Sequence, residues 1–246
     1  MIFLRLMSFD FKNNIIKKPV MIVYMFIMPI ILFYLLQGLS ANEFGKNITS
    51  SDYYGVAVLI FFQLGMGTMV ANALMENSVK KPNIRIIYSL ENKSYIYISK
   101  IISTLLCNLF SVMFYMAVCA NIFNVNFGEN VVLVYISYIV LGLFSMSLGT
   151  LLCTILKEEN LTNNILGITQ SILCLLGGVF FPVEAMGSLI STVSNLSIVK
   201  WILDGMYKYI YDGVFINITI ICAISIVITI AIMILVKYTF KIEDYI

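Results

Sequence analysis

The chain has 246 residues, of which 61% are hydrophobic and only 11% are charged. Such a chain cannot bury its apolar side chains in one core and still keep a wet surface, so a soluble globular protein is excluded and a polytopic membrane protein is predicted. The net charge of +2 is small and the basic residues form no stripe, which leaves nothing to support nucleic-acid binding.

The N-terminal segment, residues 1–18, carries Arg5 and three lysines among Phe, Leu and Ile. Two interpretations stay open: an amphipathic helix in the membrane interface, whose apolar face is interrupted by Asp10 and Asn13, or a basic anchor before the first span. Residues 19–39 form an apolar run too long for the core of a signal peptide, so we expect a retained span with a kink at Pro29.

Five further apolar runs meet the length needed to cross a bilayer. Together with the first they predict an all-α integral membrane protein, with a single transmembrane domain over residues 1–246 and six transmembrane helices. The predicted spans are residues 19–39, 53–74, 101–123, 131–156, 165–181 and 214–236. None contains Asp, Glu, Lys or Arg, which disfavours a proton-driven transporter because such a transporter usually needs an ionisable group at membrane depth.

Six spans place both termini on one side of the membrane. The segments on that side hold 12 of the 15 Lys and Arg residues, and the segments on the other side hold three. The positive-inside rule therefore predicts a multi-pass plasma-membrane protein with both termini in the cytoplasm.

Uncharged polar and small residues mark some of the spans. Gln63 and Gln170 are predicted to form hydrogen bonds between helices or to contact a substrate. Small residues recur on one face of two spans and would pack within the chain, form a dimer seam or line a substrate path. These stripes are Gly142, Ser145 and Gly149 in the fourth span, and Gly167, Ser171, Cys174 and Gly178 in the fifth.

Two segments outside the spans stand out. The loop 75–100 mixes charges with several isoleucines, so it is either a surface helix that docks a cytoplasmic partner or a simple basic anchor. The stretch 176–205 breaks at Gly177, Gly178 and Pro182 and is then too short to cross the bilayer. It predicts short re-entrant helices between the fifth and sixth spans, in an outer region at 182–213.

Motifs of enzymatic sites are missing from the sequence. Gly45-Lys46 lacks the upstream glycine of a phosphate-binding loop, and there is no GxGxxG, GxSxG or HExxH pattern. The five cysteines lie singly in apolar stretches and the chain has no histidine, so neither disulfides nor a metal site is expected. We therefore predict a protein that is not an enzyme and holds no cofactor.

Three stretches share features with a known family. KKPVMIVYMFIMPIILFYLL has a basic-Pro start and a mid-span proline, here Pro19 and Pro29. The loop 76–100 ends in a lysine before the third span. GGVFFPVEAM is followed by LSIVKWILDGM, which ends in Asp-Gly and Met. Together these stretches resemble the membrane subunit of an ABC exporter of the type-2 permease family, the group that includes small multidrug and bacteriocin-resistance permeases.

The resemblance implies a permease that pairs with a second copy of itself or a paralogous permease, surrounded by membrane lipid. Each half would bind a separate ABC ATPase subunit, which would hold the ATP. It also implies three groups of functional residues. ATPase coupling would involve Glu76, Arg85, Glu91 and Lys100; the substrate path Gln63, Gly67, Gln170 and Cys174; and the outer gate Phe180, Phe181, Pro182, Glu184 and Asp204.

The leading hypothesis is thus an efflux permease that moves a lipophilic or amphipathic compound, such as a drug, a peptide antibiotic or a lipid-like molecule, with energy from a partner ATPase. Two alternatives remain. One is a secondary transporter coupled to an ion gradient through backbone carbonyls. The other is a membrane immunity or assembly protein that transports nothing.

Overall fold

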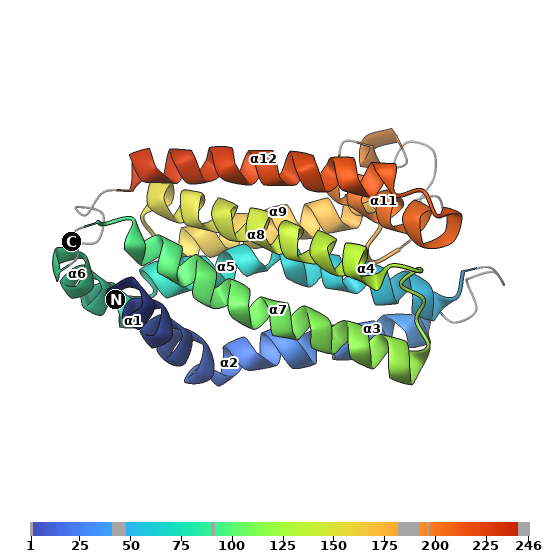
Figure 1. The fold of residues 1–246 in the computed structure, drawn as a ribbon, viewed down its shortest axis with the longest axis horizontal. Helices are drawn as coiled ribbons and strands as arrows, with labels where there is room; N and C mark the ends of the chain where they lie inside the picture. Colours follow the sequence, from blue (N-terminus) through green and yellow to red (C-terminus); the bar gives the residue numbers. More distant parts are fainter. Residues whose placement is uncertain (1, 41–47, 90–91, 182–191, 196, 241–246) are drawn as a thin grey trace.

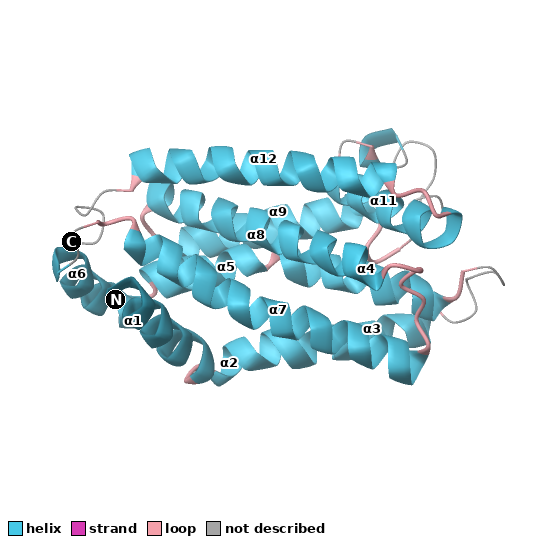
Figure 2. Cartoon of the chain, in the orientation of Figure 1, coloured by secondary structure: helices cyan, strands magenta, loops and turns pink. Residues whose placement is uncertain are grey.

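The computed structural model describes residues 2–40, 48–89, 92–181, 192–195 and 197–240, and these form an elongated helical bundle (Figure 1). Within these ranges the secondary structure is helical, without strands (Figure 2). The helices are α1 (Ile2–Asp10), η1 (Phe11–Ile16), α2 (Pro19–Ile22), η2 (Val23–Ile27), α3 (Met28–Leu39), α4 (Ser50–Leu64), α5 (Met66–Met75), α6 (Asn77–Ser89), α7 (Tyr95–Phe123), α8 (Val131–Leu156), α9 (Glu159–Gly177), α11 (Ile198–Asp212) and α12 (Ile216–Thr239).

Five helical stretches of the described chain are long and apolar enough to cross a membrane. They are Pro19–Leu39, Ser50–Met75, Tyr95–Phe123, Val131–Leu156 and Ile216–Thr239. The all-α membrane fold predicted from the sequence is confirmed at this level. α9, which covers most of the predicted fifth span, is not among the five, because its first two turns are polar. It nevertheless packs against α5 and α8 and runs beside them along the bundle (Figure 1).

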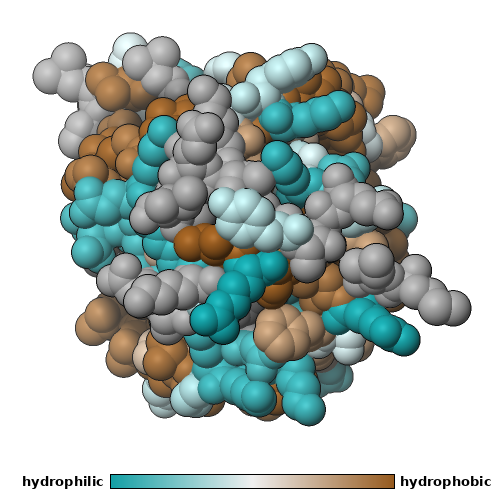
Figure 3. Space-filling view, turned by 90° about the vertical axis from the view of Figure 1, so that its left-hand side faces the viewer, coloured by the Kyte–Doolittle hydropathy of each residue, from teal (hydrophilic) through white to brown (hydrophobic). Residues whose placement is uncertain are grey.

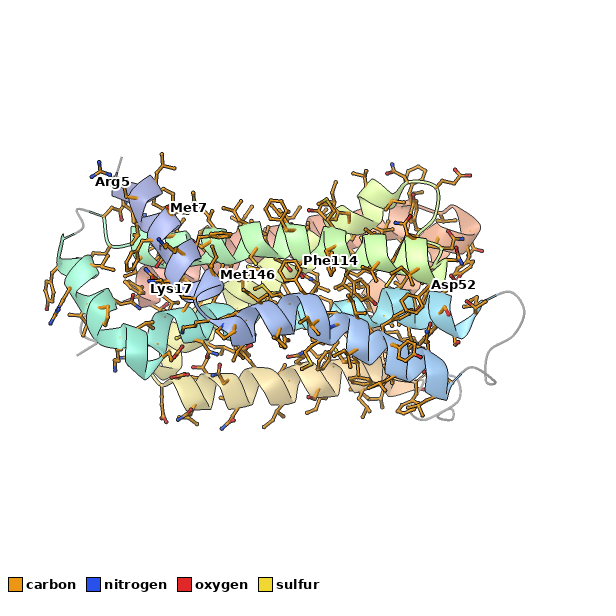
Figure 4. All side chains as sticks on the ribbon, turned by 90° about the horizontal axis from the view of Figure 1, so that it is seen from below. Arg5, Met7, Lys17, Asp52, Phe114 and Met146 are labelled. Carbon is orange, nitrogen blue, oxygen red and sulfur yellow. The ribbon has the colours of Figure 1, made fainter. Side chains whose placement is uncertain are left out.

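The bundle has two distinct ends. α1 and α6 lie at one end, where α12 also finishes, whereas α11 and the α7–α8 connection lie at the other (Figure 1). We call the first the basal end and the second the distal end. Figure 4 shows Arg5 and Lys17 at the basal end and Asp52 at the distal end. Residues 182–191, and with them most of the predicted re-entrant region before α11, lie outside the described residues.

The first span is not a regular α-helix. Its middle, Val23–Ile27, is π-helical, and α-helical geometry resumes at Met28. Pro29 has no N–H to donate to the carbonyl four residues earlier, that of Met25. The Ser111 hydroxyl of α7 donates to this Met25 carbonyl at 2.5 Å instead. The π-helical segment thus lies just before Pro29 and is bonded to a neighbouring helix, while the kink predicted at Pro29 stays a prediction.

The second span is interrupted at Gly65, between α4 and α5, where the sequence predicts an unbroken helix. The Ser145 hydroxyl of α8 fills the break: it donates to the Leu64 carbonyl and accepts from the Gly67 N–H at 3.0 Å. A side chain at Gly65 would overlap the Tyr24 hydroxyl. This break depends on groups supplied by two other helices, so local sequence does not reveal it.

α8 is the central helix and contacts α4, α5, α7 and α12. Its stripe of small residues faces α4 and α5. A side chain at Gly142 would overlap the Gln63 amide, and one at Gly149 would overlap the backbone of Gly67. The packing of this stripe within the chain, one of the predicted alternatives, is confirmed, and the close backbone approach explains why small residues are needed there.

Candidate functional site

The basal end holds a buried ion pair that joins α1 to α7. Lys100 Nζ lies 2.9 Å from Asp10 Oδ1, and both side chains are 1% exposed. The Ser99 hydroxyl donates to the other carboxylate oxygen of Asp10 at 2.5 Å, and the Ser103 hydroxyl donates to the Met7 carbonyl at 3.1 Å. The ion pair and these two hydrogen bonds attach the last turn of α1 to α7. Both charges of the pair are removed from water, so neither can lose its partner without a large cost.

A second set of contacts joins the first span to α5 and α6. Lys18, which precedes α2, forms an ion pair with Glu76, which lies between α5 and α6. The Asn83 amide of α6 donates to the carbonyls of Ala73 and Leu74 at 3.3 and 2.9 Å. These are carbonyls of the last turn of α5, which have no partner within their own helix. α6 is thereby attached to the end of the second span.

We call these five residues, Asp10, Lys18, Glu76, Asn83 and Lys100, the basal joint. Two predicted coupling residues, Glu76 and Lys100, belong to it. Arg85 instead lies exposed on α6, and Glu91 lies outside the described residues. Sequence reasoning missed Asp10, Lys18 and Asn83 as members of this joint; the one available signal was that Asp10 is the only acidic residue among the first 18.

The surface of the basal end is polar in large part (Figure 3). Exposed residues of α6 include Pro82, Arg85 and Tyr88, the last with 67% of its side chain accessible. An exposed tyrosine beside a cation is typical of a protein contact surface rather than of a simple anchor. The surface helix predicted within residues 75–100 is present as α6; docking of a cytoplasmic partner on it stays a prediction.

The predicted path residues are buried inside the single chain. Gln63 and Asn108 exchange two hydrogen bonds between their amides, at 3.2 and 2.8 Å, across the α4–α7 contact. Gln170 donates to the Phe61 carbonyl at 2.8 Å, joining α9 to α4. Both glutamines therefore make the interhelical hydrogen bonds that were one of their two predicted roles.

The other two path residues are equally enclosed. Gly67 lies against the Ser145 backbone, to which an added Cβ would come within 2.7 Å, and Cys174 is fully buried. The stripe on α9 is divided: Cys174 faces the core, whereas Gly167 has open space around it and Ser171 is exposed. The open part continues into exposed apolar residues at alternate spacings of four and three, which are Leu161, Ile165, Ile168, Ile172 and Leu175.

At the distal end, α4 holds the chain where α9 stops. The Tyr53 hydroxyl donates to the Gly178 carbonyl, and the Tyr54 hydroxyl donates to that of Phe180 at 3.0 Å. The Tyr207 hydroxyl of α11 donates to the Tyr53 carbonyl at 2.8 Å, and the two rings stack with centroids 5.3 Å apart. This tyrosine clamp fixes the predicted gate residue Phe180 on α4 through backbone groups.

The remaining gate residues have different positions. Phe181 is exposed, while Pro182 and Glu184 lie outside the described residues. Asp204 lines a pocket of about 440 Å³ together with Tyr207, Lys208 and other residues of α11, α4 and the end of α9. Burial, followed by the nearby Asp52 carboxylate, raises the pKa of Tyr211 in this pocket, so its hydroxyl stays protonated.

Comparison of the sequence with known protein families identifies the family of this chain. The profile of the ABC-2 type transporter family matches residues 3–211, which is most of the chain. The chain belongs to the ABC-2 type transporters. The resemblance found in the sequence is thus confirmed, and the protein is a multi-pass membrane subunit of the ABC permease type. No curated protein matches the chain significantly.

ABC-2 type permeases work with ABC ATPases and often form dimers, and the permease domain carries no ATPase site of its own. In this ABC-2 chain the matched region runs from α1 through the joint and the clamp to the end of α11. α12 lies beyond the match and packs against α8 and α11.

Proposed function

We propose that this chain is the membrane-spanning half of an exporter that moves a lipophilic or amphipathic compound out of the cell, with energy from a separate ATPase subunit that docks on α6. Both termini and the basal end lie in the cytoplasm, and the tyrosine clamp lies at the outer face. The chain binds no ATP itself; its partner does.

The basal joint is the observation that carries the proposal. A displacement of α6 would be transmitted to α5 through Asn83 and to the first span through the Glu76–Lys18 pair. It would be transmitted to α7 through the N-terminal helix and the Asp10–Lys100 pair. Packed side chains transmit such a displacement because they are dense and poorly compressible. An external motor at this end would therefore move three spans together, whereas an ion-coupled carrier needs no such surface.

The exposed face of α9 supports a second permease subunit beside it. Gly167 leaves room for a close helix, and the apolar residues that flank it recur at the spacing of a helix–helix seam. The predicted path residue Gln170 lies on the opposite face of α9. A cargo route between two subunits would then run along α9 and reach Gln170 and Cys174 when this helix shifts relative to α4 and α5.

The distribution of charge supports the proposed orientation. Arg5, Lys12, Lys17 and Lys18 lie in the N-terminal segment at the basal end, which also carries the cations of α6. Lys and Arg concentrate on the cytoplasmic side of membrane proteins, which supports a cytoplasmic basal end. This is the side on which ATP and an ATPase subunit are found.

The proposal is tested by co-expressing the chain with the ATPase subunits of its host and measuring which ATPase co-purifies. We expect no hydrolysis from the chain alone and one bound ATPase, whose yield falls at least about tenfold (~1.4 kcal/mol) in Arg85→Glu. Lys237→Glu, an equal charge change at an exposed basal residue of α12, is the matched control and should retain the ATPase.

Cell assays separate the alternatives. Protection against a panel of amphipathic peptide antibiotics should vanish when the Walker lysine of the partner ATPase is replaced. Protection that persists in that strain would identify a sequestering protein, and efflux that survives ATP depletion but not loss of the ion gradient would identify a secondary transporter. Either result, or ATP hydrolysis by the chain alone, contradicts the proposal.

A further inference from the structure

A groove of about 580 Å³ lies between the distal halves of α7 and α8. One wall comes from α7, where Met113, Met116, Ala117 and Ala120 recur on one face, and the other from Val131, Val132 and Tyr135 of α8. Ala117 and Ala120 are exposed, and their short side chains leave the space. We call this feature the lateral groove.

The lateral groove has two closed ends. Toward the middle of the bundle, the Tyr135 hydroxyl of α8 donates to the Leu109 carbonyl of α7 at 3.0 Å and ties the helices together. At the distal end the connecting loop closes it, held by the Asn126 N–H, which donates to Asp52 at 2.9 Å. Between Met113 and Ala120 the groove follows α7 for about 10 Å.

The groove opens on an apolar surface of the bundle. Both walls belong to candidate membrane spans. Its margins continue into large exposed apolar side chains, among them Phe114, Ile122 and Val132, with 45%, 66% and 62% of their surface accessible. No charged side chain lines it, and its polar groups are limited to the distal loop and Tyr135.

From these features we infer that the lateral groove binds one acyl chain of a membrane lipid, with the lipid head group at the distal loop. Water is a poor occupant because an ordered water needs two to four polar partners, which the walls do not offer. An empty groove would forfeit the dispersion contacts of its lining. A lipid tail supplies these contacts, and an uncharged lining matches it.

Binding here differs from ordinary solvation by the bilayer. Moving a tail from bulk lipid into the groove gains no hydrophobic free energy, since both environments are apolar. The preference comes from contacts on several sides of the tail, and from the exposed Asn126 and the loop backbone that can meet the head group. The occupant should therefore be a single, slowly exchanging lipid.

The test uses tryptophan quenching by phosphatidylcholine with brominated acyl chains, titrated into detergent-purified protein. Trp201 is the only tryptophan and lies outside the groove, so Trp201→Phe gives a silent background. Met113→Trp reports from the groove. Phe110→Trp reports from α7 outside the groove, and the two native side chains are similarly exposed, at 57% and 59%.

We expect the groove reporter to show a saturable phase at about one lipid per chain, at a lipid concentration at least about tenfold lower than the quenching of the control reporter. Ala117→Phe with Ala120→Phe should fill the groove and abolish this phase. Ala223→Phe with Ala231→Phe, the same change at exposed positions of α12, should not.

Equal lipid dependence of the two reporters would overturn the inference, because it would mean that only ordinary solvating lipid contacts the groove. Absence of quenching at Met113→Trp would do the same and would point to another occupant. The reporter comparison stands even if the filled variant does not fold. The outcome is also independent of any ATPase, so failure here leaves the proposed transport function intact.

Discussion

The buried pair between Asp10 and Lys100 should dominate the stability of the basal end. Lys100→Met removes the cation that pairs with the Asp10 carboxylate, in a site where both partners are 1% exposed. Removing one member of a buried ion pair typically costs about 3–5 kcal/mol, since the remaining charge stays buried without that partner. Asp10→Asn should cost about as much for the same reason.

The double variant Asp10→Leu with Lys100→Met separates charge burial from packing. With both charges gone the desolvation penalty disappears, so we expect a cost of roughly 0–2 kcal/mol, including an uncompensated Ser99 hydroxyl. Glu76→Gln is the matched control: its pair with Lys18 is part-exposed, at 24% and 33%, and should contribute at most about 1 kcal/mol.

Equilibrium unfolding in mixed detergent micelles measures these free energies directly. The reasoning is refuted if the Lys100→Met and Asp10→Asn proteins unfold within about 0.5 kcal/mol of the parent, because a buried pair cannot lose one charge at so small a cost. It is also refuted if the double variant is as unstable as the sum of the singles, since packing rather than charge would then hold α1 on α7.

Three further changes test the interior and the orientation. Ser111→Ala should cost about 1–3 kcal/mol in unfolding free energy, because it removes a buried hydrogen bond to the π-helical carbonyl of Met25. A change below about 0.5 kcal/mol would contradict that role. Gly149→Ala should lower the free energy of unfolding by about 1–3 kcal/mol, because the added Cβ overlaps the backbone of Gly67. Gly167→Ala adds its Cβ in open space and should be nearly neutral in the same unfolding assay. Asn195→Cys, exposed at the distal end, should react with an impermeant thiol reagent in intact cells, and Lys93→Cys only after permeabilisation; the reverse pattern would invert the proposed topology.

The positions of the five membrane-length helices of the described chain could be predicted because the bilayer sets one length scale that an apolar run must match. The fifth predicted span, at residues 165–181, does not meet this criterion in α9. The run at residues 19–39 begins and ends where the helical stretch of the first span does. The interruption at Gly65 could not be predicted in this way. It depends on the Ser145 hydroxyl and the Tyr24 ring, which reach it from other helices. Local periodicity carries no information about such partners.

The residues of the candidate site also differ in how far the sequence could predict their roles. The family resemblance implies a coupling role for Lys100. Its partner Asp10 lies 90 residues away, and the sequence predicts for Asp10 only a break in an apolar face. Asn83 was missed because nothing in the sequence distinguishes one asparagine in a polar helix from another. Its role comes from the structure, where its amide donates to carbonyls at the end of α5. Sequence patterns predict which helix or loop a residue lies on. The roles of Asp10 and Asn83 depend instead on which helices pack against each other in the folded chain.

The distribution of polar contacts also constrains how a cargo can cross. Within the described chain the amides of Gln63 and Asn108 satisfy each other, and Gln170 is bonded to the α4 backbone. A cargo that used these groups from inside the bundle would have to break buried hydrogen bonds, at about 1–3 kcal/mol for each group left unsatisfied. The proposed route along the exposed face of α9 leaves the Gln63–Asn108 pair intact and exchanges only the Gln170 bond when α9 shifts. For the proposed exporter, this route is therefore cheaper than one through the interior of the bundle.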